Sequence, residues 1–166
     1  LSCRSKDGAV SKKSTLEEIS IRNLGIIEES LLEITPGLNV VTGETGAGKT
    51  MILTALSLVL GEKSDSSLVR HGSERLVAAA TFHIPEVSQA LMDTLNEGDL
   101  EVEDSQIVLT RSVTSEGKSK ATLNGSPVTA STLGDVTDHL IEIHGQSANH
   151  QIIKPAYQRD LLDKYG

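Results

Sequence analysis

Residues 43–50 (GETGAGKT) match the pattern G-x-x-x-x-G-K-[ST] without a mismatch. In such a loop consecutive backbone N–H groups surround a phosphate, and glycines at three positions remove the Cβ atoms that would block it. Lys49 would bring a positive charge to the β- and γ-phosphates, and the Thr50 hydroxyl would bind Mg²⁺. We predict a nucleoside triphosphate site here, formed by Gly43, Glu44, Thr45, Gly46, Ala47, Gly48, Lys49 and Thr50.

The elements on either side of this loop are those that a phosphate loop requires. Residues 38–42 (LNVVT) predict a short buried strand that ends at the loop. Residues 49–60 carry apolar side chains at helical spacing, and Gly61 is suited to end that helix. The N-terminus of the helix would direct the positive end of its dipole at the bound anion.

The rest of the chain alternates short strands with a few helices. Residues 1–15 are polar and are predicted to be a flexible leader or tag, with order beginning at Leu16. Further strands are expected at 16–24, 26–34, 76–84, 107–113, 120–123 and 140–143, and helices at 85–95, at 132–139 and from Pro155 onward. The strongest hairpin signal is Asn124-Gly125. We therefore expect one α/β lobe over residues 16–166, with a mixed β-sheet, antiparallel hairpins and a phosphate-loop helix.

Composition limits the classes of function. The chain has 166 residues, a formal net charge of −8 and a single cysteine, Cys3. The negative charge argues against general binding of nucleic acid through a broad basic surface. No apolar run approaches the length of a membrane span, so no membrane partner is expected. One cysteine cannot form an internal disulfide, which fits a reducing compartment.

Motifs that complete a hydrolytic site are absent from the sequence. GTPases need an N-K-x-D stretch, and no asparagine here is followed by lysine. The arginines that a small kinase would place in a lid do not cluster. No apolar strand ends in Asp-Glu, and no serine-glycine-glycine signature is found. By itself the chain therefore predicts an incomplete ATPase.

This pattern of presence and absence resembles the split heads of SMC-type ABC ATPases. Residues 37–50, 67–74 (SLVRHGSE) and 141–166 together resemble, more narrowly, the RecN family of bacterial DNA repair proteins. In that family a long antiparallel coiled coil follows this lobe, and the carboxylate strand, signature motif and catalytic glutamate lie beyond it. The resemblance covers nearly the whole chain after the leader and implies the N-terminal lobe of a head.

The resemblance also implies roles for individual residues. Gln146 matches the glutamine of the Q-loop, which binds Mg²⁺ or orients the attacking water, so Lys49 and Gln146 are the implied catalytic residues. Arg70 lies where SMC-type heads carry an arginine linked to DNA or to the partner's nucleotide. Arg22 and Asn23 match a position that contacts phosphate or base. From the sequence alone, each of these residues also has a purely structural interpretation. Arg70 could be an exposed loop arginine, and Arg22 and Asn23 could be an ordinary strand end.

The implied activity is ATP hydrolysis with Mg²⁺ in DNA double-strand break repair and recombination. Two heads of a homodimer would enclose ATP, each completed by its own C-terminal half, and nucleotide state would control DNA handling in the bacterial cytoplasm, at the nucleoid. Two alternatives remain open at this point: a nucleotide-binding module without activity of its own, and a stand-alone P-loop kinase.

Overall fold

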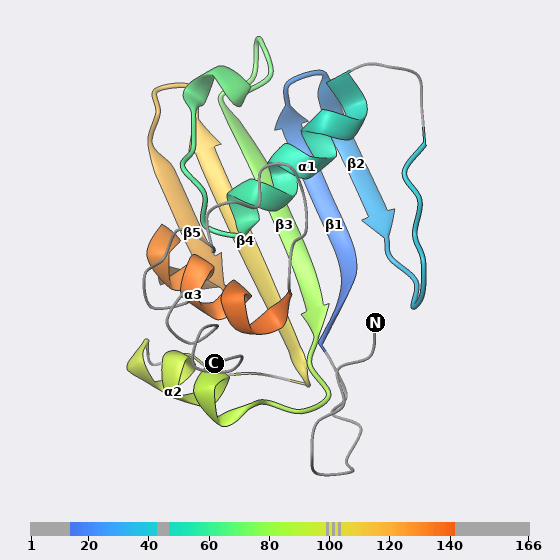
Figure 1. Cartoon of the computed structure of the whole chain (residues 1–166). Helices are drawn as coiled ribbons and strands as arrows, with labels where there is room; N and C mark the ends of the chain where they lie inside the picture. Colours follow the sequence, from blue (N-terminus) through green and yellow to red (C-terminus); the bar gives the residue numbers. More distant parts are fainter. Residues whose placement is uncertain (1–13, 43–46, 99, 101, 103, 142–166) are drawn as a thin grey trace, which may run out of the picture.

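The structure is a computed structural model, and it describes residues 14–42, 47–98, 100, 102 and 104–141. These residues form one sheet with the strand order β2-β1-β3-β4-β5-β6, in which every described pairing is antiparallel (Figure 1). The strands are β1 (Thr15–Leu24), β2 (Ile27–Glu33), β3 (Arg75–His83), β4 (Gln106–Thr114), β5 (Ser119–Leu123) and β6 (Ser126–Val128).

The described helices cover one face of this sheet (Figure 1). Helix α1 (Ala47–Val59) crosses β1, β3 and β4, and helix α3 (Ala130–Leu140) packs on β5. Helix α2 (Gln89–Glu97) contacts α3, and a short 3-10 helix, η1 (Ser66–Leu68), follows α1. No helix among the described residues has both the length and the apolar content to cross a membrane.

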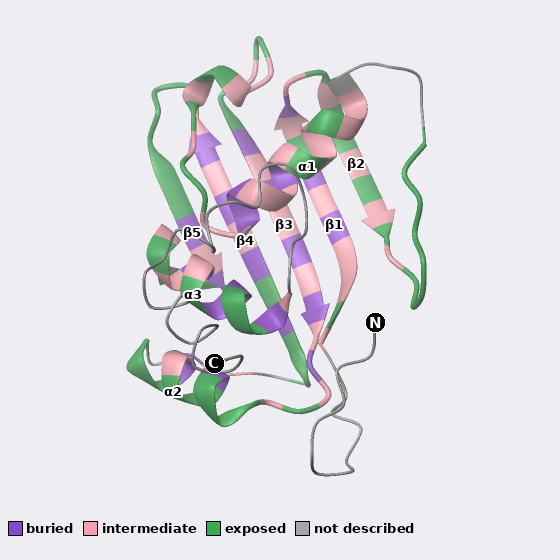
Figure 2. Ribbon diagram, viewed as in Figure 1, coloured by how far each residue is buried: buried purple, intermediate pink, exposed green. Residues whose placement is uncertain are grey.

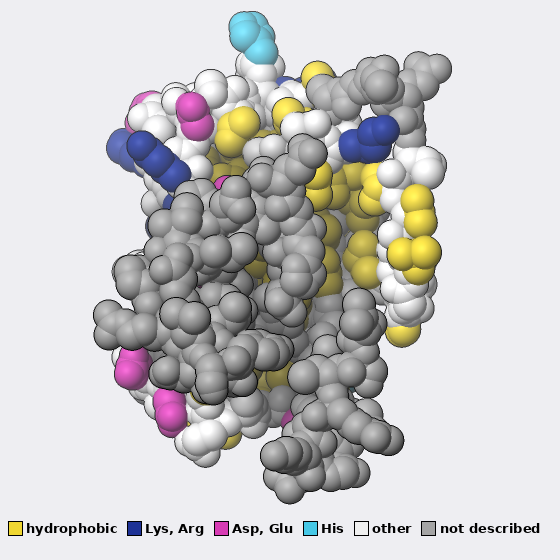
Figure 3. Space-filling model, in the orientation of Figure 1, with side chains coloured by type: hydrophobic (Ala, Val, Ile, Leu, Met, Phe, Trp, Pro, Cys, Tyr) yellow, Lys and Arg dark blue, Asp and Glu magenta, His cyan; other side chains and the backbone are white. Residues whose placement is uncertain are grey.

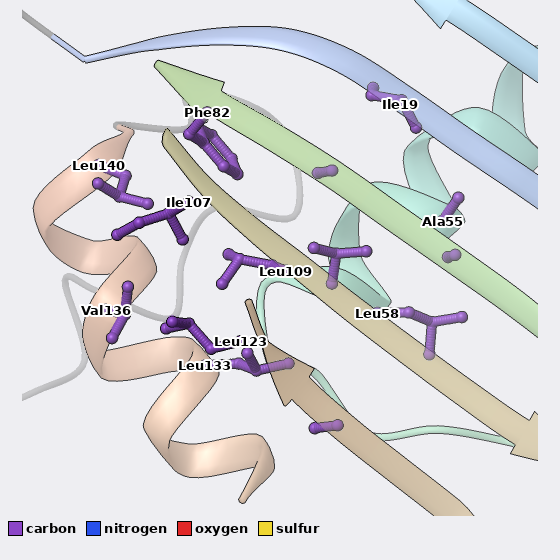
Figure 4. Close-up of a cluster of buried hydrophobic side chains, with 14 of the residues drawn as sticks. Ile19, Ala55, Leu58, Phe82, Ile107, Leu109, Leu123, Leu133, Val136 and Leu140 are labelled. Atoms are coloured by element: carbon purple, nitrogen blue, oxygen red, sulfur yellow. The ribbon is translucent and has the colours of Figure 1, made fainter. Parts of the chain in front are cut away.

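The core lies between the sheet and these helices. Side chains alternate between the two faces of each strand, so buried and less buried residues alternate along β1, β3 and β4 (Figure 2). One cross-strand row joins Ile19, Ala80, Leu109 and Leu123, and all four are buried. Figure 4 shows Leu123 beside Leu133 of α3. The aliphatic side chains of the sequence therefore build a continuous core beneath the helices.

The turns follow the chemistry of their residues. Asn124 and Gly125 have φ values of 46° and 84°, as the two-residue turn between β5 and β6 requires. The Asn124 carboxamide oxygen accepts a hydrogen bond from the backbone N–H of Val108 at 2.7 Å. The predicted hairpin is confirmed, and its asparagine also connects β4 to the turn.

Several predicted boundaries need correction. Thr15, assigned to the leader, is the first residue of β1. Helix α2 begins after Ser88, whose hydroxyl accepts a hydrogen bond from the backbone N–H of Leu91, and not at Pro85. The capping hydroxyl satisfies a free N–H group at the helix start, which proline does not do. Leu140, placed in a strand, is the last residue of α3. Residues 1–13 and the helix expected from Pro155 lie outside the described residues.

The buried strand predicted before the phosphate loop is wrong. Residues 38–42 form no strand, and Leu38, Val40 and Val41 are 92%, 69% and 50% exposed. The segment runs past β2 toward the start of α1 (Figure 1), and apolar side chains are visible on it in Figure 3. An apolar run of this kind becomes a buried strand only when neighbouring strands pair with it, and no described strand does so.

Candidate phosphate site at the start of helix α1

Four of the eight predicted phosphate-loop residues form the first turn of α1. The turn contains Ala47, Gly48, Lys49 and Thr50, whereas residues 43–46 lie outside the described residues. The first four N–H groups of an α-helix have no acceptor within the helix, and the helix dipole places partial positive charge at this end. No acidic side chain occupies this turn. The turn therefore offers N–H donors and positive potential to an anion.

The side chains of this turn leave room for a ligand. A Cβ atom added at Gly48 would meet no other atom within 4 Å, so the backbone is open to close approach there. Thr50 is exposed and Lys49 half-buried. The Thr50 carbonyl accepts a hydrogen bond from the Thr54 hydroxyl at 2.8 Å, within the helix. These residue types fit a phosphate group, with the exposed Thr50 hydroxyl available for a divalent cation.

The turn between β1 and β2 packs directly against the first turns of α1. Gly25, with φ of +54°, donates its N–H to the carbonyl of Leu68 at 2.8 Å. A Cβ atom at Gly25 would lie 2.7 Å from Sδ of Met51, two residues after Lys49. The positive φ favours glycine here, and the Met51 side chain would have to move to admit a Cβ atom. The β1–β2 turn therefore contacts the helix that carries Lys49.

Arg22 and Asn23, at the end of β1, have partners within the chain. Nε of Arg22 donates to Oε1 of Glu29 at 2.9 Å, and both side chains are exposed, so this pair contributes little stability. Asn23 has φ of +54° and donates from Nδ2 to the carbonyl of Arg75 at 3.3 Å. The structure thus gives Asn23 a role in joining β1 to β3.

Arg70 connects the segment after η1 to the β1–β2 turn. Its Nη1 donates to the carbonyl of Ile26 at 2.8 Å, and its Nη2 lies 3.5 Å from Oε2 of Glu28. The backbone N–H of Arg70 donates to the carbonyl of Asn23 at 2.9 Å. Asn23 and Arg70, singled out separately in the sequence, are therefore neighbours beside the turn that packs on α1.

Other predicted residues are not placed. Gln146 lies outside the described residues, so its distance from Lys49 and Thr50 is not defined by this structure. Among the described residues no group of His, Cys, Asp and Glu side chains is arranged to hold a metal ion.

Asp65, at the start of η1, accepts a hydrogen bond from the backbone N–H of Ser67 at 2.8 Å, and this bond lowers the pKa of its carboxyl group.

One buried polar residue was not singled out from the sequence. Arg111 lies on β4 between Leu109 and Val113, two buried residues that face the helices. The alternation of Ile107, Leu109 and Val113 places residue 111 on the buried face of the strand. That periodicity was the signal from which a buried arginine could have been inferred.

With this geometry, comparison with known proteins defines the class of protein. The family model described as RecF/RecN/SMC N terminal domain matches residues 15–144. The chain belongs to this family.

The particular relatives are DNA repair proteins. The chain is 39% identical over 150 residues to DNA repair protein RecN of Vibrio cholerae, a match that covers 90% of this chain and 27% of that protein. It is 39% identical over 145 residues to DNA repair protein RecN of Streptomyces coelicolor, covering 87% of this chain and 25% of the relative. The chain thus spans about a quarter of the length of these curated relatives, and the predicted resemblance to RecN is confirmed.

Solved structures share the fold at low sequence identity. The Smc head domain with an extended coiled coil, bound to the C-terminal domain of ScpA and derived from Pyrococcus furiosus, matches with a TM-score of 0.66 and 20% identity, covering 91% of this chain and 41% of that one. The recombination mediator protein RecF with ATP matches with a TM-score of 0.61 and 19% identity, covering 92% and 39%. The predicted α/β head fold is therefore confirmed.

Proposed function

We propose that this chain is the ATP-binding lobe of a RecN-like SMC-family ATPase that acts in DNA double-strand break repair and recombination. The observation that carries the proposal is the placement of Lys49 and Thr50 in the first turn of α1, at an open helix N-terminus in a RecN-related N-terminal domain. The RecF relative was solved with ATP, which supports the same ligand here.

Each residue of the site has a defined role in this proposal. The backbone N–H groups at the start of α1 hold the phosphates, and Lys49 neutralises part of their negative charge. Thr50 and Gln146 would hold Mg²⁺, or Gln146 would orient the attacking water. Bound ATP supplies the phosphoanhydride bond whose hydrolysis releases the closed state. The residue that activates the water belongs to the C-terminal half of the head, because no carboxylate strand occurs in this sequence.

Exposed apolar side chains support the need for a C-terminal half. Leu38, Val40 and Val41 precede the loop, and Leu53 of α1 is 66% exposed on the side of the helix away from the sheet. Several large exposed apolar side chains are typical of a surface that another part of the protein covers. We infer that the C-terminal half of the head covers these residues and completes the nucleotide site.

Two further partners belong to the proposal. A matching SMC structure comes from work on ATP-driven dimerization and DNA-stimulated activation of SMC ATPases, which supports a second head and DNA as partners here. The lobe would begin with β1 at Thr15, and the residues before β1 would form a leader, in a protein of the bacterial cytoplasm that works at the nucleoid. With a net charge of −8, DNA contact by this lobe would be local, and Arg70 is the candidate for contact with DNA or a partner. Arg22 and Asn23 would instead contact the phosphate or base of the nucleotide.

ATP turnover by this chain, with and without the C-terminal half of the head, tests the proposal. We expect turnover only when both halves are present, and no turnover when the chain carries Lys49→Ala. Binding of ATP without turnover in either case would favour the nucleotide-binding module. Substantial turnover by this chain alone would contradict the incomplete site, and transfer of phosphate to a small molecule would favour the kinase.

A further inference from the structure

Arg111 occupies an unusual place for a charged side chain. It lies near the middle of β4, on the face of the sheet that α1 and α3 cover, with only 6% of its surface exposed. Its cross-strand neighbours are Ala78 on β3 and Ala121 on β5. Two alanines leave space on the sheet for a long side chain, so the position accommodates the guanidinium group without displacing the core.

The guanidinium group of Arg111 is incompletely paired within the described residues. Its Nε is buried and has no hydrogen-bond partner, and Arg111 takes part in none of the ion pairs found there. Burial lowers the pKa of Arg111, yet an arginine remains protonated at neutral pH. A buried donor left without an acceptor costs free energy, so a further acceptor for this Nε–H would stabilise the position.

The surroundings favour a carboxylate as that acceptor. The nearest neighbours along and across the strands are apolar: Leu109, Val113, Ala78 and Ala121. A doubly charged phosphate needs several donors or cations, and these four side chains provide none. A carboxylate carries one charge and is matched by the two parallel N–H groups of a single guanidinium.

We propose that Arg111 is a docking site for a carboxylate side chain carried by the C-terminal half of the head. This inference rests on the proposed function, in which that half covers the helix side of this lobe. The chain spans about a quarter of the length of its relatives, so most of the polypeptide that supplies such a carboxylate lies outside it. The resulting buried ion pair would connect β4, beneath the phosphate-loop helix, to the other half.

Two variants separate this proposal from a purely structural role. Arg111→Met keeps a side chain of similar length and removes the charge, and Arg75→Met removes a charge from an exposed position on the neighbouring strand. In this chain alone we expect Arg111→Met to raise Tm by about 3 °C or more, because a buried N–H donor without an acceptor is lost. Arg75→Met should leave Tm unchanged.

In the presence of the C-terminal half the sign reverses. We expect Arg111→Met to weaken association of the two halves about 30-fold or more, because the partner carboxylate is then left buried and unpaired. Arg75→Met should bind as the wild type does. In the ¹⁵N spectrum of the wild-type chain, the Nε–H signal of Arg111 should shift when the C-terminal half is added.

Defined results would overturn the proposal. These are an Arg111→Met chain that melts below the wild type or fails to fold, an unchanged affinity between the halves, or an Nε–H signal that shifts with inorganic phosphate instead. If the wild-type halves restore ATP turnover while Arg111→Met associates normally, this inference fails and the proposed function stands. If the wild-type halves do not associate, both fail.

Discussion

Gly61, two residues after the end of α1, packs directly against the backbone of Gly134 in α3. A Cβ atom at Gly61 would lie 2.8 Å from the amide nitrogen of Gly134, and Gly61 has φ of +90°. Both facts require glycine, because the left-handed φ disfavours a side chain and the neighbouring backbone leaves no room for one. The contact joins the segment that follows α1 to the first turns of α3.

Gly61→Ala should therefore destabilise the chain severely. The unfavourable φ costs about 1 kcal/mol, and displacement of α3 from α1 adds about 2 kcal/mol. For a chain of this size the sum corresponds to a fall in Tm of about 6 °C or more, measured by thermal unfolding. Gly117→Ala is the matched control, because Gly117 has φ of +85° and no atom within 4 Å of an added Cβ. Equal effects of the two substitutions would show that the helix contact is unimportant.

Asp65 predicts a local pH dependence. The hydrogen bond from the Ser67 backbone, with a smaller contribution from the Ser67 hydroxyl, lowers the pKa of Asp65. A lowered pKa means that the carboxylate stabilises the start of η1 at neutral pH, and that this contribution is lost as pH falls below about 4. The backbone amide of Ser67 should titrate in that range in NMR spectra. Asp65→Asn should abolish the titration, and its persistence in that variant would contradict the assignment.

Much of the fold follows from the sequence because local chemistry decides it. Alternation of apolar residues along 76–84 and 107–113 gave the central strands, and helical spacing after Lys49 gave α1 within two residues of its start. Asn124-Gly125 adopted the turn that these residues prefer. In each case the residues themselves specify the conformation, with little dependence on the rest of the chain.

The remainder depends on contacts between distant segments. The exposure of Val40 is set by which strands lie beside residues 38–42, and the proximity of Asn23 and Arg70 arises from the packing of the β1–β2 turn. Arg111 was missed because a single arginine interrupts an otherwise apolar face. For the candidate site, sequence pattern identified Lys49 and Thr50, but the close contact between Gly25 and Met51 required the structure.

Val40→Glu should separate the stability of this lobe from its assembly. Val40 is 69% exposed, so in this chain alone the substitution should change the free energy of unfolding by about 0.5 kcal/mol or less. If the C-terminal half covers this segment, a buried carboxylate there should prevent association and ATP turnover. Leu31→Glu, at a position 59% exposed on β2, is the control and should leave association intact. Normal turnover of Val40→Glu with the C-terminal half would exclude residue 40 from the interface.

Lys49→Ala tests the site itself. Lys49 lies in the first turn of α1, where its ammonium group adds a full charge to the partial charge of the helix N-terminus. In the complete head we expect the substitution to abolish ATP binding, measured by calorimetric titration, while Tm without nucleotide changes little. Lys63→Ala removes an exposed lysine from the loop after α1 and should bind ATP as the wild type does. Lys49→Ala removes the full positive charge of this side chain from the start of α1. An unchanged ATP affinity in this variant would therefore show that the nucleotide binds elsewhere.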